Sequence, residues 1–185
     1  MRGGLQPDTG RVDSGVVGEH SDTRPVDGIF LAEEAATTRL GASLADTLGA
    51  GDTLLLEGPI GAGKSHLARA LIQAAAHRAG LPAPDVPSPT YTLVQSYALG
   101  GLEIVHADLY RLSDPSELAE LGLEDAFGMA LCLIEWPDRL GDYAPPNAIR
   151  ARLRVDGSGR RVSFATEADA ESQRIAAMLR AGGFL

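Results

Sequence analysis

Lysine, cysteine and long apolar segments are scarce in this sequence of 185 residues, and each scarcity excludes a class of protein. The one cysteine, Cys132, cannot form an internal disulfide or a cysteine-based zinc cluster, and we expect it to lie in the core. No segment approaches the roughly 20 apolar residues of a membrane span, and residues 1–27 contain no apolar segment of the signal-peptide kind. The sequence therefore predicts a cytoplasmic protein of a reducing compartment that does not enter a membrane.

Basic residues are too few for a nucleic-acid-binding protein. Lys and Arg total 16 against 25 Asp and Glu, which gives a net charge of −9, and no run of basic residues is concentrated at one place. Tight binding to a phosphate backbone requires such a concentration of positive charge. We therefore expect no DNA binding, and contact with RNA only through partner proteins.

Composition divides the chain into two parts. Residues 1–27 lack aromatic side chains and hydrophobic periodicity, so they are predicted to form a flexible tail. Residues 28–185 have the usual size of one domain, and an apolar content of 44% is enough for a single buried core.

Strands and helices alternate through most of the predicted domain. Apolar residues recur every four positions from Ala36 to Leu48, which is typical of a helix, whereas Thr53–Glu57 is a continuous apolar run typical of a strand buried on both faces. This alternation predicts an α/β fold, with a mainly parallel sheet flanked by helices and a C-terminal β-hairpin and helix. The further elements that we expect are strands at 91–98, 102–107 and 130–135, helices at 67–77 and from 114 onward, a hairpin formed by 148–155 and 161–166, and a helix at 169–180.

A glycine-rich segment follows the first of these strands. Residues 58–65 read GPIGAGKS, match the pattern G-x-x-x-x-G-K-[ST] and lie between a predicted strand and a predicted helix. In this pattern the backbone N–H groups bind phosphate oxygens, the lysine contacts the β and γ phosphates, and the hydroxyl binds Mg²⁺. The segment therefore predicts a P-loop in an NTPase-like fold, with the phosphates at the N-terminus of the following helix.

The lysine of this segment is the only one in the chain. The other 15 basic side chains are arginine, although the compact ammonium of Lys64 suits a tight phosphate loop better than a planar guanidinium would. Proteins of this class that are specific for guanine usually recognise the base with an Asn-Lys-x-Asp segment. This chain cannot contain that segment, so ATP is the expected nucleotide.

Two acidic residues end later strands of the predicted sheet. Asp108 follows the strand at 102–107, and Glu135 ends the strand at 130–135. Parallel strands present such residues at the sheet edge where ligands bind, and Mg²⁺ prefers oxygen ligands. Both are candidate metal or catalytic residues, with a helix cap or a surface acid as the alternative for each.

Several motifs in a fixed order make the prediction more specific. Over residues 29–165 the chain resembles the TsaE family, the ATPase subunit of bacterial tRNA threonylcarbamoyladenosine synthesis. The motifs that carry the resemblance are Ala36-Thr37-x-x-Leu40-Gly41, Gly61-Ala62-Gly63-Lys64-Ser65, Ser88-Pro89-Thr90-Tyr91-Thr92-Leu93, His106-Ala107-Asp108-Leu109-Tyr110-Arg111-Leu112 and Ile134-Glu135-Trp136-Pro137.

The resemblance implies a Mg²⁺-dependent ATPase that acts with two partner proteins, TsaD and TsaB, in modifying tRNA. It implies catalytic roles for Lys64, Asp108 and Glu135, metal binding by Ser65 and Glu135, and a switch-like segment at 88–93. The residues implied to bind the nucleotide are Thr37, Gly61, Ala62, Gly63, Lys64, Ser65, His66, Trp136 and Arg160. A core position for Trp136 and a solvated position for Arg160 are the alternatives for those two.

The loop departs from the usual family sequence at two informative positions. Pro59 has no N–H to donate to phosphate, and His66 replaces a hydroxyl residue, whereas Ser65 retains the hydroxyl that binds Mg²⁺. The motifs also fit a regulatory module that binds ATP and hydrolyses it incidentally. A small-molecule kinase is a third interpretation, weakened by the scattered arginines and the lack of a lid segment.

Overall fold

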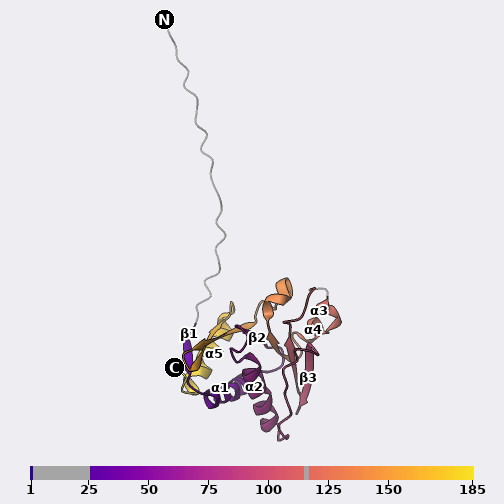
Figure 1. Cartoon of the computed structure of the whole chain (residues 1–185), viewed down its shortest axis with the longest axis vertical. Helices are drawn as coiled ribbons and strands as arrows, with labels where there is room; N and C mark the ends of the chain where they lie inside the picture. Colours follow the sequence, from indigo (N-terminus) through magenta and orange to yellow (C-terminus); the bar gives the residue numbers. More distant parts are fainter. Residues whose placement is uncertain (2–25, 115–116) are drawn as a thin grey trace.

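A seven-stranded sheet with helices on both faces forms the body of the protein (Figure 1). The computed structural model describes residue 1, residues 26–114 and residues 117–185. Strands in the order β1-β7-β6-β2-β5-β4-β3 make up the sheet. Their bounds are β1 Val26–Leu31, β2 Thr53–Glu57, β3 Val94–Leu99, β4 Leu102–Asp108, β5 Leu131–Glu135, β6 Ile149–Asp156 and β7 Gly159–Ala165.

The centre of this sheet is parallel. Strands β6, β2, β5 and β4 pair in parallel, while β7 joins β6 in an antiparallel hairpin and β3 joins β4 in another. Strand β1 pairs antiparallel with β7 and so runs in the direction of the central strands. The mainly parallel α/β sheet with a late hairpin, predicted from the sequence, is confirmed.

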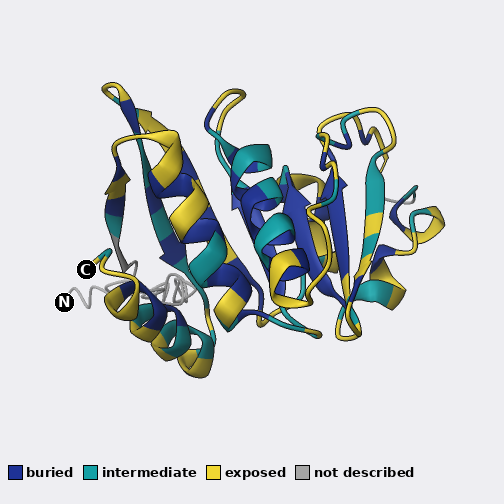
Figure 2. Ribbon diagram, turned by 90° about the horizontal axis from the view of Figure 1, so that it is seen from below, coloured by how far each residue is buried: buried dark blue, intermediate teal, exposed yellow. Residues whose placement is uncertain are grey.

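The helices lie in two groups on opposite faces, because side chains alternate along each strand. Leu54 and Leu56 of β2 pack in a core with the longer helices, whereas Leu55 packs in a second core with the shorter segments. Figure 2 shows the buried inner sides of the longer helices against the sheet. The longer helices are α1 Glu34–Thr47, α2 Lys64–Arg78 and α5 Asp169–Ala181, and the shorter segments are α3 Glu117–Glu120, α4 Leu123–Ala126 and the 3-10 segment η1 Pro137–Tyr143.

Close packing of α1 on α2 depends on one glycine of the first family motif. A Cβ atom at Gly41 would lie 2.5 Å from the Cβ of Ala70, so a side chain there would push the two helices apart. This approach brings the N-terminal half of α1 beside the start of α2, where the phosphate loop ends. Within the described residues no helix is long and apolar enough to cross a bilayer.

Some elements differ from the expectation. Strand β1 was not predicted, and it begins at Val26, so Val26 and Asp27 belong to the sheet rather than to the predicted tail. The rest of that tail, residues 2–25, lies outside the described residues, as do residues 115–116 in the helix expected from 114. Strand β3 begins at Val94 rather than at Tyr91, since residues 90–93 form a turn in which Leu93 has a φ of 63°.

Candidate nucleotide-binding site

Residues 58–63 form the predicted loop between the end of β2 and the start of α2. The φ angles of Gly58, Gly61 and Gly63 are 136°, 77° and 103°, values that residues with a side chain rarely adopt. Gly58 is also crowded, because a Cβ atom there would lie 2.2 Å from the carbonyl oxygen of Leu153. The local sequence therefore fixes a turn whose backbone faces the N-terminus of α2, as a phosphate-binding loop requires.

Lys64 begins α2 and lies almost completely buried, with 5% of its surface exposed. Its Nζ donates hydrogen bonds to the carbonyl oxygens of Gly58 at 2.8 Å and Pro59 at 3.0 Å. Burial lowers the pKa of the ammonium, and the negative charges of Glu135 and Asp108 oppose that shift. The loop thus holds a cation at its centre on neutral carbonyl groups, which the charged oxygens of a phosphate would outcompete.

Ser65 and Glu135 meet next to this lysine. The Ser65 hydroxyl donates to Oε2 of Glu135 at 3.0 Å, and Glu135 is 2% exposed. A hydroxyl and a carboxylate oxygen this close fit Mg²⁺, which usually takes one or two protein oxygens and completes its shell with phosphates and water. The described residues contain no group of three or more His, Cys, Asp or Glu side chains arranged for a metal.

Asp108 lies beside Glu135, as the parallel pairing of β4 with β5 requires. Its Oδ2 accepts hydrogen bonds from Thr90 Oγ1 at 2.7 Å and from Ser88 Oγ at 3.1 Å. Its Oδ1 accepts one from the backbone N–H of Tyr110 at 3.1 Å. The carboxylate therefore connects the edge of the sheet to the segment 88–93 that the sequence singled out.

A cavity of about 380 Å³ adjoins the loop on the side of α1. It brings together predicted nucleotide-binding residues from three separate parts of the chain: Thr37 on α1, Ala62, Gly63 and His66 around the loop, and Arg160 on β7. Arg160 also donates from Nη2 to the carbonyl oxygen of Gly61 at 3.3 Å. The cavity therefore joins the loop to the N-terminal part of α1 and the start of β7.

Trp136 is not among the residues that line this cavity. It follows Glu135 with a φ of 58°, and its ring centroid lies 4.2 Å from Nζ of Lys64 and 5.0 Å from the ring of Tyr110. A cation above an aromatic face is a favourable contact. Trp136 therefore packs on the Lys64 side of the loop, and is partly buried against the second core.

His106 lies in one of the family motifs, but the sequence assigns it no role. The structure buries it completely and places its Nε2 3.0 Å from Oε1 of Glu135. The signal was present in the sequence, since a histidine inside the apolar run LEIVHAD should point into a core by strand alternation. Ser88 and Thr90 were recognised only as part of a switch-like segment, because their contact with Asp108 depends on a turn that periodicity does not predict.

Comparison with known proteins supports the resemblance to the TsaE family. The family model that matches residues 31–162 is described as "Threonylcarbamoyl adenosine biosynthesis protein TsaE". A protein of Rickettsia felis named tRNA threonylcarbamoyladenosine biosynthesis protein TsaE is 35% identical over 147 residues, covering 80% of this chain and 84% of its own. The protein of the same name from Bacillus subtilis is 34% identical over 131 residues, covering 70% of this chain and 76% of its own.

A solved structure shares the fold. The crystal structure of Bacillus subtilis YdiB matches with a TM-score of 0.66 at 21% sequence identity, and the match covers 85% of this chain and 96% of that one. The two proteins thus share one fold. Together with the family match over more than half of the chain, these findings show that the chain belongs to the TsaE family, which takes part in the biosynthesis of threonylcarbamoyladenosine in tRNA.

Proposed function

We propose that this protein binds ATP with Mg²⁺ and hydrolyses it as a subunit of the machinery that forms threonylcarbamoyladenosine in tRNA, acting with TsaD and TsaB. The observation that carries the proposal is the convergence of three buried charged residues, Lys64, Asp108 and Glu135, beside a glycine loop at one edge of the sheet. Buried charges are costly, so a fold that gathers several of them is arranged for a charged ligand.

Each part of the site has a role in this proposal. Lys64 and the loop amides would bind the phosphates, and Ser65 with Glu135 would hold Mg²⁺ between them. Asp108 would lie near the γ-phosphate. The nucleoside side of ATP would occupy the cavity of about 380 Å³ that is lined by Thr37, His66 and Arg160. Bound Mg²⁺ would neutralise charge on the phosphates, while the protein positions them for attack by water.

Hydrolysis would be transmitted to the partner proteins through the segment at 88–93. Asp108 is hydrogen-bonded to Ser88 and Thr90, so a change at the γ-phosphate would reach these residues through one carboxylate. Segments held by a γ-phosphate and released after hydrolysis are a common way to change the affinity of a nucleotide-dependent protein for its partners. The net charge of −9 favours contact with tRNA through TsaD and TsaB rather than directly. As part of a machinery that modifies tRNA, the protein would act in the cytoplasm.

The test is phosphate release by the purified chain, alone and with TsaD and TsaB, in Mg²⁺ and in EDTA. We expect Mg²⁺-dependent release that the partners stimulate and that Glu135→Gln reduces at least tenfold. Glu57→Gln is a matched control, since Glu57 also ends a strand of the sheet but pairs with two exposed arginines instead. It should leave the rate unchanged.

Two results would replace the proposal by an alternative. Intact tRNA modification by a Glu135→Ala protein that still binds ATP, with no stimulation of hydrolysis by the partners, would favour a regulatory module controlled by ATP occupancy. Transfer of labelled γ-phosphate to a metabolite instead of water would favour a small-molecule kinase.

A further inference from the structure

His106 is a fully buried polar side chain, and its hydrogen bond is to Glu135 of the candidate metal site. Its register partner on β5 is Leu133, and its neighbour on the same face of β4, Ile104, is a buried member of the apolar core. Its Nε2 lies 3.0 Å from Oε1 of Glu135, and within the described residues its buried Nδ1 has no hydrogen-bond partner. An apolar residue would pack here without the cost of burying an imidazole, so the pair with Glu135 calls for a function.

The two oxygens of Glu135 are held by different neighbours. Oε2 accepts the hydroxyl of Ser65 from α2, and Oε1 lies against the imidazole of His106 from β4. Because a carboxylate can only accept, Nε2 of His106 must carry the proton in this pair. The carboxylate plane is therefore fixed from both sides, with Oε2 directed at the hydroxyl that would share a metal ion.

We infer that His106 is a positioning residue that orients Glu135 for Mg²⁺. Groups that hydrogen-bond a metal-binding carboxylate from outside fix its orientation, and their loss weakens metal binding although they do not touch the ion. His106 has this relation to Glu135, and no other hydrogen bond of its imidazole is formed within the described part of the chain. The inference rests on the proposed function, since it presupposes that Ser65 and Glu135 bind Mg²⁺ together with a nucleotide.

The test is ADP affinity measured by calorimetry in Mg²⁺ and in EDTA. It is expressed as the dissociation constant in EDTA divided by the dissociation constant in Mg²⁺, so that a larger ratio means a larger contribution of the metal. His106→Met removes the donor and keeps an apolar side chain of similar length, and His106→Gln keeps an N–H donor near the position of Nε2. We expect the ratio to fall about tenfold in His106→Met and to recover most of its value in His106→Gln. Affinity in EDTA should change less than twofold in either variant.

A matched core variant separates positioning from general destabilisation. Val105 is the neighbouring buried residue of β4 and faces the opposite core, so Val105→Ala should lower the unfolding temperature without changing the ratio. Should His106→Met not fold, His106→Asn against His106→Gln gives the same comparison, because the asparagine amide is too short to reach Glu135. There the ratio should fall only in His106→Asn.

The outcomes distinguish the inference from the function on which it rests. A wild-type protein whose ADP affinity is the same in Mg²⁺ and EDTA would overturn the magnesium site itself and the inference with it. A clear Mg²⁺ effect in the wild type that persists undiminished in His106→Met, or in His106→Asn, would overturn the role of His106 alone.

Discussion

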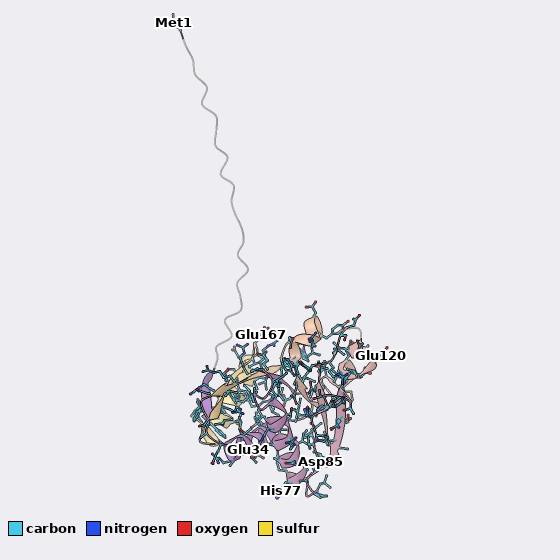
Figure 3. All side chains as sticks on the ribbon, viewed as in Figure 1. Met1, Glu34, His77, Asp85, Glu120 and Glu167 are labelled. Atoms are coloured by element: carbon cyan, nitrogen blue, oxygen red, sulfur yellow. The ribbon has the colours of Figure 1, made fainter. Side chains whose placement is uncertain are left out.

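Two cavities lie on opposite faces of the sheet, and only the smaller one lies at the phosphate loop. The larger, of about 630 Å³, lies against the face of β6 and β7 that is turned away from the longer helices. Arg150, Arg152 and Glu57 are among the residues that line it. The smaller, of about 380 Å³, adjoins the glycine loop. Figure 3 shows Glu167, which lines the larger cavity, far from Glu34, which lines the smaller.

Charge is present at both places, but its burial differs. The side chains of Arg150 and Arg152 are 48% and 71% exposed and form ion pairs with Glu57, whereas Lys64 and Glu135 are 5% and 2% exposed. Exposed ion pairs contribute little free energy because water solvates the separated charges almost as well. Buried charges are retained only where something compensates them. The proposed site thus differs from the larger cavity in its buried charge and strained backbone rather than in its size.

The largest predicted effect is a loss of unfolding free energy when a glycine of the loop is replaced. Gly58→Ala would place a Cβ atom 2.2 Å from a backbone oxygen at a φ of 136°, so we expect unfolding free energy to fall by about 3 kcal/mol in urea titrations. Gly61→Ala is the matched control: its φ is 77°, but a Cβ atom there meets nothing within 4 Å, and it should cost about 1 kcal/mol. Equal losses in the two variants would show that crowding at Gly58 is unimportant.

The second prediction concerns the buried cation. Lys64→Ala should weaken ADP binding about 100-fold in calorimetry, or about 2.7 kcal/mol, since a charge-assisted hydrogen bond to the β-phosphate contributes up to about 3 kcal/mol. Arg154→Ala, which removes an exposed cation from β6, is the control and should change affinity less than twofold. A Lys64→Ala protein that retains affinity within threefold of the wild type would refute binding of the phosphates at this loop.

Much of this region could be predicted because its signals are local. The loop at 58–65 has a fixed pattern, and the apolar runs ending at Asp108 and Glu135 predict buried strands whose carboxyl ends lie at the edge of the sheet where ligands bind. The pairing of β4 with β5, which puts Asp108 in register with Glu135, is known from the structure only. Cys132 lies in the core as expected, and its burial raises the pKa of the thiol to about 12.

Other features could not be predicted because they depend on contacts between distant segments. Strand β1 lies at an edge of the sheet, where β7 is its one strand neighbour among the described residues, and its sequence VDGIFL shows no clear alternation, so the strand is not predicted and its first two residues fall in the predicted tail. The contact of Thr90 with Asp108 requires a turn in which Leu93 adopts a left-handed conformation. Arg160 gave no signal of its own beyond the family resemblance. Its place in the cavity results from the pairing of β7 with β6, which brings it to the loop.

The third prediction tests whether the smaller cavity holds the nucleoside side of the ligand. Arg160 lies at its rim and already donates to Gly61, so Arg160→Ala should weaken ADP binding about tenfold, or about 1.4 kcal/mol, and Arg160→Lys should lose less. Calorimetry checks this point by comparing ADP with inorganic pyrophosphate, which has no nucleoside. Arg160→Ala should weaken the binding of ADP and leave the binding of pyrophosphate unchanged. Arg161→Ala is the control, since the next residue on β7 bonds Asp156 and Gly28 instead. Equal weakening by both substitutions would mean that the effect is one of general charge.

The smallest effect is expected at the larger cavity. Glu57→Gln removes both ion pairs with Arg150 and Arg152, each at 2.9 Å, yet it should lower the unfolding free energy by less than about 1 kcal/mol, because the arginines are exposed. The difference should shrink in concentrated NaCl, which screens such pairs. ADP affinity should stay within twofold of the wild type. Because Glu57 directly precedes Gly58, a tenfold change in that affinity would mean that the arginine face is coupled to the phosphate loop, and the two cavities would then have to be treated as one functional unit.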